Sequence, residues 1–318
     1  MKTIGVLTSG GDAPGMNAAI RAVVKTADYY GLDVIGIQYG YQGLMDGKIQ
    51  PLLVSDVEDI ADRGGTILKT SRSAEFMKEE GRKRALQVLE RFGVDGLVVI
   101  GGEGSLKGAE TLHQLGVKVI GIPATIDNDL AYTDYSIGFD TTLNTILDCI
   151  GKIKDTDFSH DKTTIVEVMG RYCGDLALYA ALAGGGEIIS TPERKLDFDT
   201  ICSKLQARIK SGKHHNVVIV TERMYDLQEL QRYIETKLNL RVRTTALGFI
   251  QRGGSPSAFD RVLASKLGVA AVDLLVNGQG GQAVGLKNNK IIYKDLAAVN
   301  EEIVDKPDLY RLLDMLLY

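Results

Sequence analysis

A short acidic turn carries the residue types best suited to catalysis. The turn Thr-Ile-Asp-Asn-Asp, residues 125–129, follows an apolar run over residues 119–122. A carboxylate can take a proton from an attacking hydroxyl, and a second carboxylate can help to hold a metal ion. Asp127 and Asp129 lie two residues apart, so in extended chain both side chains project to the same side. We therefore expect one to act as a base and the other to assist metal binding.

A glycine-rich turn follows the preceding apolar run. That run, residues 97–100, has the length and β-branched content of a strand buried on both faces, and it ends at Gly-Gly-Glu-Gly-Ser over residues 101–105. Glycines let the backbone approach phosphate oxygens, and the helix expected after them points its free N–H groups at an anion. Glu103 would repel a bare phosphate. A divalent cation such as Mg²⁺, bridging this carboxylate and the phosphates, removes that conflict.

Both turns also have an ordinary interpretation, because Gly-Gly and Asp-Asn-Asp sequences occur in loops without any ligand. Either turn alone leaves that alternative open. Two such turns after consecutive strands favour a phosphate and metal site, since ligands of open parallel sheets bind outside the carboxyl ends of the strands. We therefore expect both turns to open into the same crevice, where a phosphoryl group is transferred.

A third glycine turn follows the first expected strand, residues 3–8. It reads Ser-Gly-Gly-Asp-Ala-Pro-Gly-Met-Asn over residues 9–17. It lacks the G-x-G-x-x-G and Walker spacings, and the strand expected over residues 33–38 does not end in an acidic residue for a ribose. We interpret it as a phosphate-approach turn of an uncommon type. Arg72, in a loop-like stretch, could supply positive charge to a transferring phosphoryl group, although a lone loop arginine is usually just solvated.

These turns need a scaffold of alternating strands and helices. Strands are expected over residues 3–8, 33–38, 97–100, 119–122, 163–168, 188–190, 217–221 and 241–249. Helices are expected over residues 17–30, 56–62, 105–115, 140–154, 175–183, 199–210, 227–237, 258–276 and 308–317, with a hairpin through 287–290. Ser55 and Glu58 read as a capping box for the helix over 56–62. The alternation predicts an α/β fold with a largely parallel sheet in two lobes, between which the chain crosses more than once.

Composition bounds the class of protein. The 318 residues are 44% hydrophobic and 25% charged, which describes a globular chain with an ample core. No apolar run is long enough to span a membrane and no leader precedes the first strand, so we expect a cytoplasmic protein. Three cysteines without metal-ligand spacing fit a reducing compartment, and a net charge of −4 argues against a nucleic-acid partner. Glycine makes up 36 of the 318 residues, a larger share than the usual value of about 7%. Several of these glycines follow strands, where a phosphate-binding α/β protein needs them.

Five motifs together resemble bacterial ATP-dependent 6-phosphofructokinase, over essentially the full length of the chain and in that family's order. They occupy residues 8–17, 101–105, 123–129, 169–174 and 251–256. The resemblance implies phosphorylation of fructose 6-phosphate at its 1-hydroxyl to give fructose 1,6-bisphosphate in glycolysis. It also implies two discontinuous lobes: an ATP-binding lobe of residues 1–138 plus 251–301, and a sugar-phosphate-binding lobe of residues 139–250 plus 302–318.

The same resemblance implies the residues of each site. Asp127 would be the base, and the other catalytic residues would be Thr125, Asp129, Arg171 and Arg72. ATP, with Mg²⁺ on Glu103, would contact Gly11, Arg72, Ser73, Gly102, Glu103, Gly104 and Ser105. Fructose 6-phosphate would contact Thr125, Ile126, Asp127, Lys162, Met169, Gly170, Arg171, Glu222, Arg243, Phe249 and Arg252. Allosteric effectors would contact Arg21, Lys25, Val54, Lys154, Gly185, Glu187, Ser211, Lys213 and His215.

This sequence departs from the family pattern at several of these positions. Glu103 replaces a usual aspartate at the metal, Lys162 replaces a usual arginine, and Phe249 replaces a usual histidine. In the effector set, uncharged residues replace basic ones and lysines replace arginines, at Val54, Ser211, Lys25 and Lys154. These changes leave the activity expected but predict weaker binding of the sugar phosphate and of the effectors.

Two other functions stay open at this point. A pyrophosphate-dependent phosphofructokinase is disfavoured because Gly104 and Ala124 are small where such relatives carry aspartate and lysine. A low-turnover binding or regulatory paralogue is supported by the family departures alone, and the intact acidic turn argues against it. Lys162 and Arg243 match positions that the family supplies from a neighbouring subunit, so we expect a homotetramer with shared active sites.

Overall fold

The structure of the chain, a computed structural model, describes residues 1–300 and 306–317. The chain divides into two compact units, each discontinuous in sequence. Unit 1 comprises Met1–Ile126, Leu130–Thr141 and Arg252–Ile303, and unit 2 comprises Asp127–Asp129, Thr142–Gln251 and Val304–Tyr318. The lobe boundary expected between residues 301 and 302 lies outside the described residues.

Unit 1 is built on a seven-stranded sheet among the described residues. Its strands are β1 (Thr3–Ser9), β2 (Asp33–Ile37), β3 (Ile49–Pro51), β4 (Gly96–Gly101), β5 (Val119–Pro123), β10 (Gln282–Lys287) and β11 (Lys290–Asp295). They lie in the order β11-β10-β5-β4-β1-β2-β3. The outer pairs β10–β11 and β2–β3 are antiparallel, and the inner strands are parallel, as the alternation of strands and helices predicts.

The register of the inner strands aligns the turns that follow them. All residues of β4 and β5 are buried, as the continuous apolar runs of parallel sheets require. Ser9 of β1 lies opposite Gly101 of β4, and Gly101 lies opposite Pro123 of β5. The carboxyl ends of these three strands therefore stand at one level. Each of them leads directly into one of the three turns singled out in the sequence.

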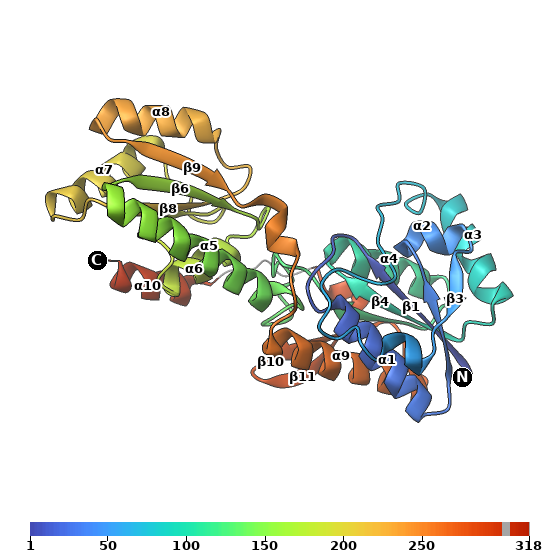
Figure 1. Cartoon of the computed structure of the whole chain (residues 1–318). Helices are drawn as coiled ribbons and strands as arrows, with labels where there is room; N and C mark the ends of the chain where they lie inside the picture. The colour runs from blue at the N-terminus through green and yellow to red at the C-terminus, as the bar shows by residue number, and fades with distance from the viewer. Residues whose placement is uncertain (301–305, 318) are drawn as a thin grey trace. The chain divides into compact units, whose positions relative to one another are not determined.

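Helices cover this sheet on both faces (Figure 1). They are α1 (Met16–Tyr29), α2 (Gly40–Met45), α3 (Glu79–Arg91), α4 (Glu103–Gln114), α9 (Ala258–Val276) and the 3₁₀ helices η1 (Val54–Val57) and η3 (Leu296–Ala298). On one face α1 packs against α9. On the other, α2, α3 and α4 share a core with the strands through Leu44, Leu89 and Leu106.

Some elements of unit 1 differ from the expected ones. The sequence pattern predicts neither α2, α3 nor β3, because α3 is mostly charged and the other two are very short. The helix expected over residues 56–62 is wrong, since the chain forms only the short turn η1 there. Its capping residues are Leu53 and Asp56, whose carboxylate accepts the Leu53 N–H at 2.8 Å, and not Ser55 and Glu58.

Unit 2 contains a four-stranded parallel sheet in its described residues. The strands are β6 (Thr163–Val168), β7 (Ile188–Ser190), β8 (Asn216–Thr221) and β9 (Val242–Ala246), in the order β7-β8-β6-β9. The helices are α5 (Phe139–His160), α6 (Asp175–Leu182), α7 (Phe198–Lys210), α8 (Leu227–Leu238), α10 (Pro307–Leu316) and the 3₁₀ helix η2 (Gly248–Arg252). Figure 1 shows α7 and α8 on one side of this sheet and α5, α6 and α10 on the other.

Two elements near the sugar-phosphate residues end elsewhere than expected. The strand predicted over residues 241–249 stops at Ala246, because Gly248 turns the chain with a φ of 55° into η2. Phe249 therefore lies on a short 3₁₀ turn and is 78% exposed. Helix α5 continues to His160, beyond the end expected at residue 154.

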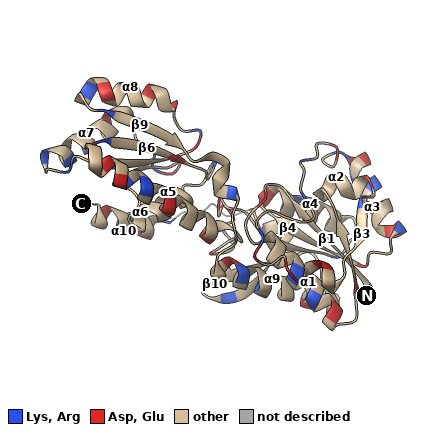
Figure 2. Cartoon of the chain, in the orientation of Figure 1, with Lys and Arg blue, Asp and Glu red and all other residues tan. Residues whose placement is uncertain are grey.

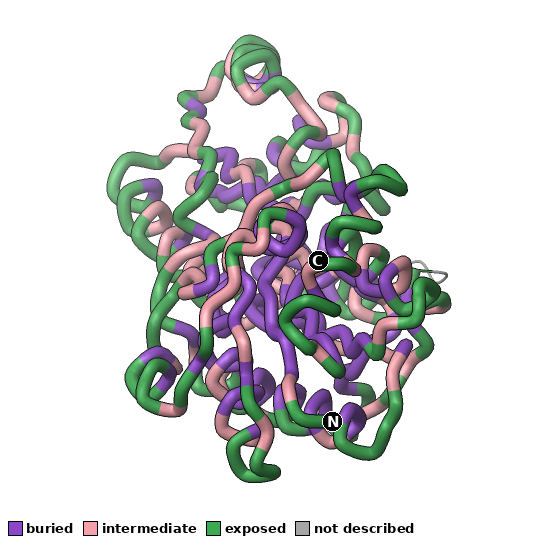
Figure 3. The backbone as a smooth tube through the Cα atoms, turned by 90° about the vertical axis from the view of Figure 1, so that its right-hand side faces the viewer, coloured by how far each residue is buried: buried purple, intermediate pink, exposed green. Residues whose placement is uncertain are grey.

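The surface and interior follow the usual separation of charge and apolar residues. Lysine, arginine, aspartate and glutamate occur along the outer helices (Figure 2), whereas Figure 3 shows buried residues in the interior. The strands β4, β5 and β8 are buried throughout. No helix in the described ranges is both long enough and apolar enough to cross a membrane.

A buried carboxylate joins two distant segments of unit 1. Asp260, near the start of α9, is fully buried and accepts the N–H groups of Gly138 at 2.9 Å and Thr141 at 2.8 Å, together with the Thr141 hydroxyl. Burial raises the pKa of Asp260, while these hydrogen bonds favour its charged form. The carboxylate thus holds the beginning of α5 against α9.

We predict that Asp260→Asn lowers the free energy of unfolding by about 1–3 kcal/mol, the cost of a buried polar group left without a partner. The new amide N–H₂ would face an N–H donor at Gly138 or Thr141. Urea titration measures the change. Asp273→Asn, on the same helix, is the matched control because that carboxylate accepts the exposed Tyr30 hydroxyl. Equal losses in the two variants would contradict the role given to Asp260.

Candidate active site

The glycine turn after β4 forms an anion-binding helix start. Gly102 is the cap of α4, and Glu103 and Gly104 are its first helical residues. A Cβ on Gly101 would lie 2.5 Å from the Ser9 carbonyl oxygen, so no larger residue fits there. A Cβ on Gly104 would meet nothing within 4 Å, so packing alone does not require that glycine. The free N–H groups and positive end of α4 are therefore exposed at a site with room for a phosphate.

Glu103 supplies an exposed carboxylate at this helix start. The positive end of α4 stabilises a negative charge in the first turn. Gly102 also meets the acidic turn closely, because a Cβ there would lie 3.3 Å from the Cβ of Thr125. An exposed carboxylate beside a phosphate site is the donor type that Mg²⁺ prefers, so the residues present fit that ion.

Hydrogen bonds within unit 1 hold the Arg72 loop beside the first glycine turn. Thr70 Oγ1 donates to the Gly10 carbonyl at 2.8 Å, and Ser73 Oγ donates to Gln42 Oε1 at 2.8 Å. Arg72, between them, is exposed. Three of the predicted nucleotide-binding segments, after β1, after β4 and around Arg72, are thus all parts of unit 1.

The structure places Arg252 against the first glycine turn and Ser105 in the first turn of α4. The Arg252 guanidinium carbon lies 3.8 Å from the Cβ position of Gly11, so a residue predicted to bind sugar phosphate rests on the first glycine turn. Ser105 is buried, its N–H donates to the Gly102 carbonyl at 2.9 Å, and its carbonyl accepts the Tyr41 hydroxyl at 2.6 Å. Its backbone position in the first turn of α4 is therefore well determined.

The acidic turn is not extended, and this corrects one premise of the sequence argument. Asn128 has a φ of 53°, in the left-handed region, so the chain bends sharply between the two carboxylates. The inference that Asp127 and Asp129 share a side because the chain is extended is therefore wrong. Burial nevertheless alternates along the turn. Ile126 and Asn128 are buried, whereas Asp127 and Asp129 are half-buried.

The turn after β6 combines two unusual backbone conformations. Gly170 has a φ of 129°, and a Cβ there would lie 2.3 Å from the Cys173 carbonyl oxygen, so only glycine fits. Arg171 follows with a φ of 54°, an uncommon value for a residue with a side chain, and is exposed. Strained backbone of this kind occurs at binding sites, where it orients a functional group in advance.

The buried side chain of Gln251 holds this turn through hydrogen bonds, a role that the sequence does not predict. Its side chain is fully buried; Oε1 accepts the Met169 N–H at 3.0 Å and Nε2 donates to the Gly248 carbonyl at 3.0 Å. The Thr142 hydroxyl donates to the Gln251 carbonyl at 2.7 Å. A glutamine inside a glycine-rich motif gives no local sign of such burial, so no sequence signal distinguishes it.

Glu222 and Met169 both directly follow the carboxyl ends of strands in the four-stranded sheet. Val168 lies opposite Thr221 in the pairing of β6 with β8, and the Glu222 N–H donates to the Val168 carbonyl at 2.8 Å. Burial, and then the nearby Glu222 carboxylate, raise the pKa of Glu167. Unit 2 thus places Met169, Arg171 and Glu222 together at the carboxyl ends of β6 and β8.

Lys162 and Arg243 lie at the other end of the strands of that sheet, the amino ends. Lys162 immediately precedes β6, and Arg243 pairs with Thr164 at the beginning of β6. A six-residue strand spans roughly 17–20 Å at about 3.3 Å per residue. The backbones of these two cations therefore start about a strand's length from those of Arg171 and Glu222.

The predicted effector residues divide between the units. Arg21 and Lys25 are on α1 and Val54 is on η1, all in unit 1. In unit 2, Lys154 Nζ pairs with Glu187 Oε1 at 2.9 Å and donates to the Gly184 carbonyl at 2.7 Å. The Glu187 carboxylate also accepts the Val217 N–H at 2.6 Å. His215 makes an edge contact with the Phe158 ring, and Gly185 lies close to the Ala180 carbonyl.

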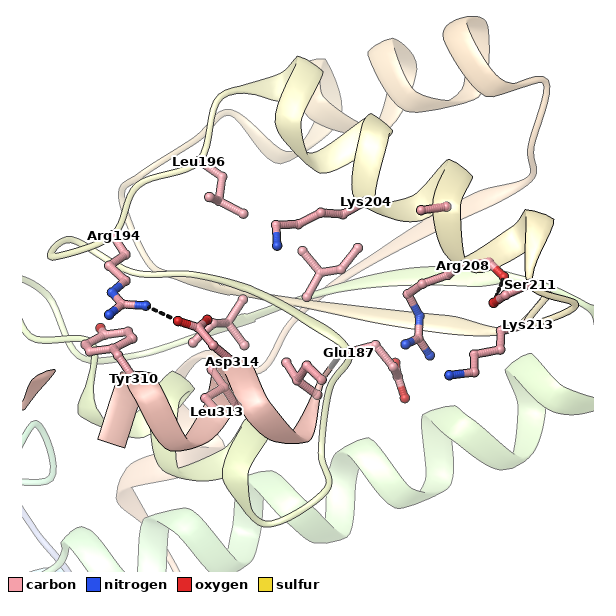
Figure 4. Close-up of a pocket in the computed structure, with 14 residues that line it drawn as sticks. Glu187, Arg194, Leu196, Lys204, Arg208, Ser211, Lys213, Tyr310, Leu313 and Asp314 are labelled. Atoms are coloured by element: carbon pink, nitrogen blue, oxygen red, sulfur yellow. Dashed lines mark hydrogen bonds and ion pairs between the residues drawn. The ribbon is translucent and has the colours of Figure 1, made fainter. Parts of the chain in front are cut away.

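A cavity of about 570 Å³ in unit 2 collects several of these residues (Figure 4). Glu187, Ser211 and Lys213 line one end, on an apolar floor that includes Ile188 and Ile189. Two further cations of α7 line the same cavity, Lys204 and Arg208, whose Nε donates to Asn216 Oδ1 at 2.6 Å. The two residues are four positions apart, about one helical turn, so they lie on the same face of α7. This spacing is the feature of the sequence that could have identified them.

Comparisons with known proteins show the family to which the chain is related. The family model described as Phosphofructokinase matches residues 3–275. A protein of Alkaliphilus metalliredigens called ATP-dependent 6-phosphofructokinase is 55% identical over 296 residues, 93% of either chain. A protein of the same name from Clostridioides difficile is 54% identical over 308 residues, 96% of this chain and 97% of that one. The solved phosphofructokinase of Saccharomyces cerevisiae has a TM-score of 0.89 at 33% identity, covering 98% of this chain and 50% of the yeast chain.

Three observations converge on one assignment. The carboxyl ends of β1, β4 and β5 stand level and lead into the glycine turns and the acidic turn, a second set of turns follows β6 and β8, and the family model matches residues 3–275. The chain belongs to the phosphofructokinase family.

Proposed function

We propose that this protein is an ATP-dependent 6-phosphofructokinase of glycolysis, which transfers the γ-phosphoryl group of ATP to the 1-hydroxyl of fructose 6-phosphate. The observation that carries the proposal is the alignment of the three turns after β1, β4 and β5, which a phosphoryl donor and a carboxylate base require. Identity of about 54–55% to proteins of that name, over nearly their whole length, supports the same substrates.

Unit 1 is proposed to bind ATP. The turns at Gly11 and Gly102 offer backbone N–H groups to the phosphates, and the exposed Arg72 adds positive charge near the first of them. Glu103 would hold Mg²⁺ against the phosphates. When bound, this ion neutralises charge on the β- and γ-phosphoryl oxygens. Ser73 and Ser105 complete the proposed nucleotide set.

Asp127 is proposed to act as the general base on the sugar. Its carboxylate takes the proton of the 1-hydroxyl as that oxygen bonds to the γ-phosphorus and ADP leaves. Thr125 and Asp129 flank it in the same turn. Arg171, which has a left-handed backbone conformation, is proposed to neutralise charge on the transferred group or on the sugar phosphate.

The pyrophosphate-dependent alternative is less well supported. A Cβ at Gly104 would enter open space, so the small residue leaves room beside the phosphate turn, where pyrophosphate-using relatives carry aspartate. Ala124 is buried at the end of β5, where a lysine would need a polar partner. A regulatory paralogue without turnover is also less well supported, because the close relatives are named as enzymes.

The separation of the predicted residues between the two ends of the four-stranded sheet supports shared active sites in a homotetramer. Lys162 and Arg243 stand at the amino ends of β6 and β9, a strand's length from Arg171 and Glu222. This separation favours a site in which Lys162 and Arg243 bind a substrate held by another copy of the chain. We propose this arrangement, and we propose a cytoplasmic location for the assembly.

We predict that Asp127→Asn lowers kcat by about 10²- to 10⁴-fold, because an amide cannot accept the proton. Steady-state assays with ATP, Mg²⁺ and fructose 6-phosphate measure the change, and circular dichroism checks the fold. Asp148→Asn, at an exposed position of α5, serves as control and should leave kcat unchanged. Near-normal turnover in Asp127→Asn would remove the mechanism.

We predict that Phe249→His, alone and with Lys162→Arg, lowers the KM for fructose 6-phosphate. Phe249 cannot donate a hydrogen bond to the 6-phosphate, and Lys162 lacks the bidentate geometry of arginine. A charge-assisted hydrogen bond is worth about 1.5–3 kcal/mol, or roughly 10- to 100-fold in affinity. The KM for ATP should stay constant.

The control for the sugar-phosphate variants is Phe92→His, a partly exposed phenylalanine at the end of α3 in unit 1. It should alter neither KM. If neither Phe249→His nor the double variant lowers the KM for fructose 6-phosphate, the 6-phosphate is held by other groups.

We predict weaker allosteric regulation than the family usually shows, because Val54 and Ser211 carry no charge for an anionic effector. Two lost charge-assisted bonds of roughly 1.5–3 kcal/mol each would abolish binding at ordinary effector concentrations. Titrating ADP and phosphoenolpyruvate against fructose 6-phosphate saturation measures this. A strong shift in half-saturation contradicts the prediction, and loss of that shift in Arg208→Ala would show that α7 supplies the missing charge.

A further inference from the structure

A buried carboxylate, Asp175, contacts the acidic turn directly. Asn128 Nδ2 donates to Asp175 Oδ2 at 2.8 Å, and both residues are almost fully buried, at 2% and 3% exposure. Both belong to unit 2. Asp175 is the first residue of α6, so the positive helix end favours its charged form. None of the sequence motifs gives this carboxylate a role in the reaction.

Asn128 lies between Asp127 and Asp129 in the chain, so its backbone conformation affects the direction of both carboxylates. Its left-handed backbone directs the chain between Asp127 and Asp129, whose peptide planes it shares. Asparagine tolerates this conformation better than most residues, but it also visits other regions. The bond to Asp175 ties the side chain down and so selects one direction for the carboxylates on either side.

Lys306 holds Asp175 in turn. Its ammonium group forms an ion pair with Asp175 Oδ2, and it lies 5.0 Å from the centroid of the Tyr179 ring. Lys306 is the residue that caps α10. The cation thus comes from the last helix of the chain, and it neutralises a carboxylate that burial would otherwise penalise.

A second set of bonds anchors α10 to the same place. The Tyr310 hydroxyl hydrogen-bonds to Thr191 Oγ1 at 2.6 Å and donates to Glu193 Oε2 at 3.1 Å. The Glu193 carboxylate accepts the Gly174 N–H, directly before Asp175, at 2.9 Å. The beginning of α6 is therefore fixed both by Lys306 and through Tyr310.

Lys306 is needed to keep the buried Asp175 carboxylate in its charged form. Burial raises the pKa of Asp175, and Glu193 raises it further, whereas Lys306 and the Asn128 amide lower it. Removing a partner from a buried charge is costly, because the remaining charge is then uncompensated. Without Lys306, Asp175 would hold Asn128 less well, through protonation or displacement.

We propose that Asp175 and Lys306 are positioning residues, which act through Asn128 to orient the acidic turn for phosphoryl transfer. The proposal rests on the proposed role of Asp127 as the base. It makes the docking of the C-terminal helix α10 a condition for full activity. A misplacement of about 1 Å in a reacting group can lower a rate by roughly 10²-fold, so loss of this chain of bonds should appear mainly in kcat.

The test uses three variants of the full-length enzyme. Asn128→Gly keeps the left-handed backbone accessible but removes the bond to Asp175, Lys306→Met removes the ion pair, and Lys306→Arg retains the charge. We expect kcat to fall about 10- to 100-fold in the first two, with the KM for ATP unchanged, and to recover substantially in Lys306→Arg. Lys237→Met is the matched control, because it breaks an exposed pair with Asp199 in the same unit.

The combined variant Asn128→Gly/Lys306→Met separates positioning from stability. If both residues act through one chain of bonds, its kcat should be no lower than that of the worse single variant. Unchanged kcat in both single variants, or losses that multiply in the double variant, overturns the proposal. A variant with a lowered melting temperature is assayed at a temperature where it is folded, and normal kcat there overturns the proposal as well. Asp127→Asn is assayed in parallel: if it is active, the proposed base fails, whereas if it alone is inactive, only the positioning role fails.

Discussion

The parallel pairing of β1, β4 and β5 is the constraint on which the active-site half of unit 1 depends. Backbone hydrogen bonds fix the register, and a shift of one residue would turn every side chain of a strand to the opposite face. The observed register sets Ser9, Gly101 and Pro123 side by side. It also explains the absence of a side chain at Gly101, since the neighbouring strand's carbonyl oxygen fills that space.

Unit 2 uses buried polar groups for the corresponding task. Its two functional turns contain left-handed residues, Asn128 and Arg171, and each such residue carries a conformational cost. The buried side chains of Asp175 and Gln251 hydrogen-bond to residues of these turns or to their neighbours. Buried hydrogen bonds of this kind offset the strain and restrict the backbone of each turn, and electrostatic stabilisation of a transition state requires such fixed groups.

Departures from the family pattern avoid the glycines and carboxylates at which the chemistry takes place, with the exception of Glu103. They gather instead among the residues proposed to bind the sugar phosphate or an effector, such as Lys162, Phe249 and Ser211. The physical difference is that phosphoryl transfer needs particular atoms at particular positions, whereas an anion can be held by cations approaching from several directions. The cavity in unit 2 illustrates this, because Arg208 and Lys204 line it beside the uncharged Ser211.

The sequence by itself determined the α/β class, most strands and helices, and the turns proposed to carry the chemistry, because apolar periodicity and glycine or carboxylate turns are local signals. It failed where the local signal was weak, at α2, α3 and β3, and where a turn replaced a regular element, at η1 and η2. Only the tertiary structure decided the left-handed bend at Asn128 and the partners of Asp175, which lie 47 and 131 residues away from it. A hydrogen bond between distant segments leaves no periodicity in either of them, so it becomes visible only when the fold brings the two together.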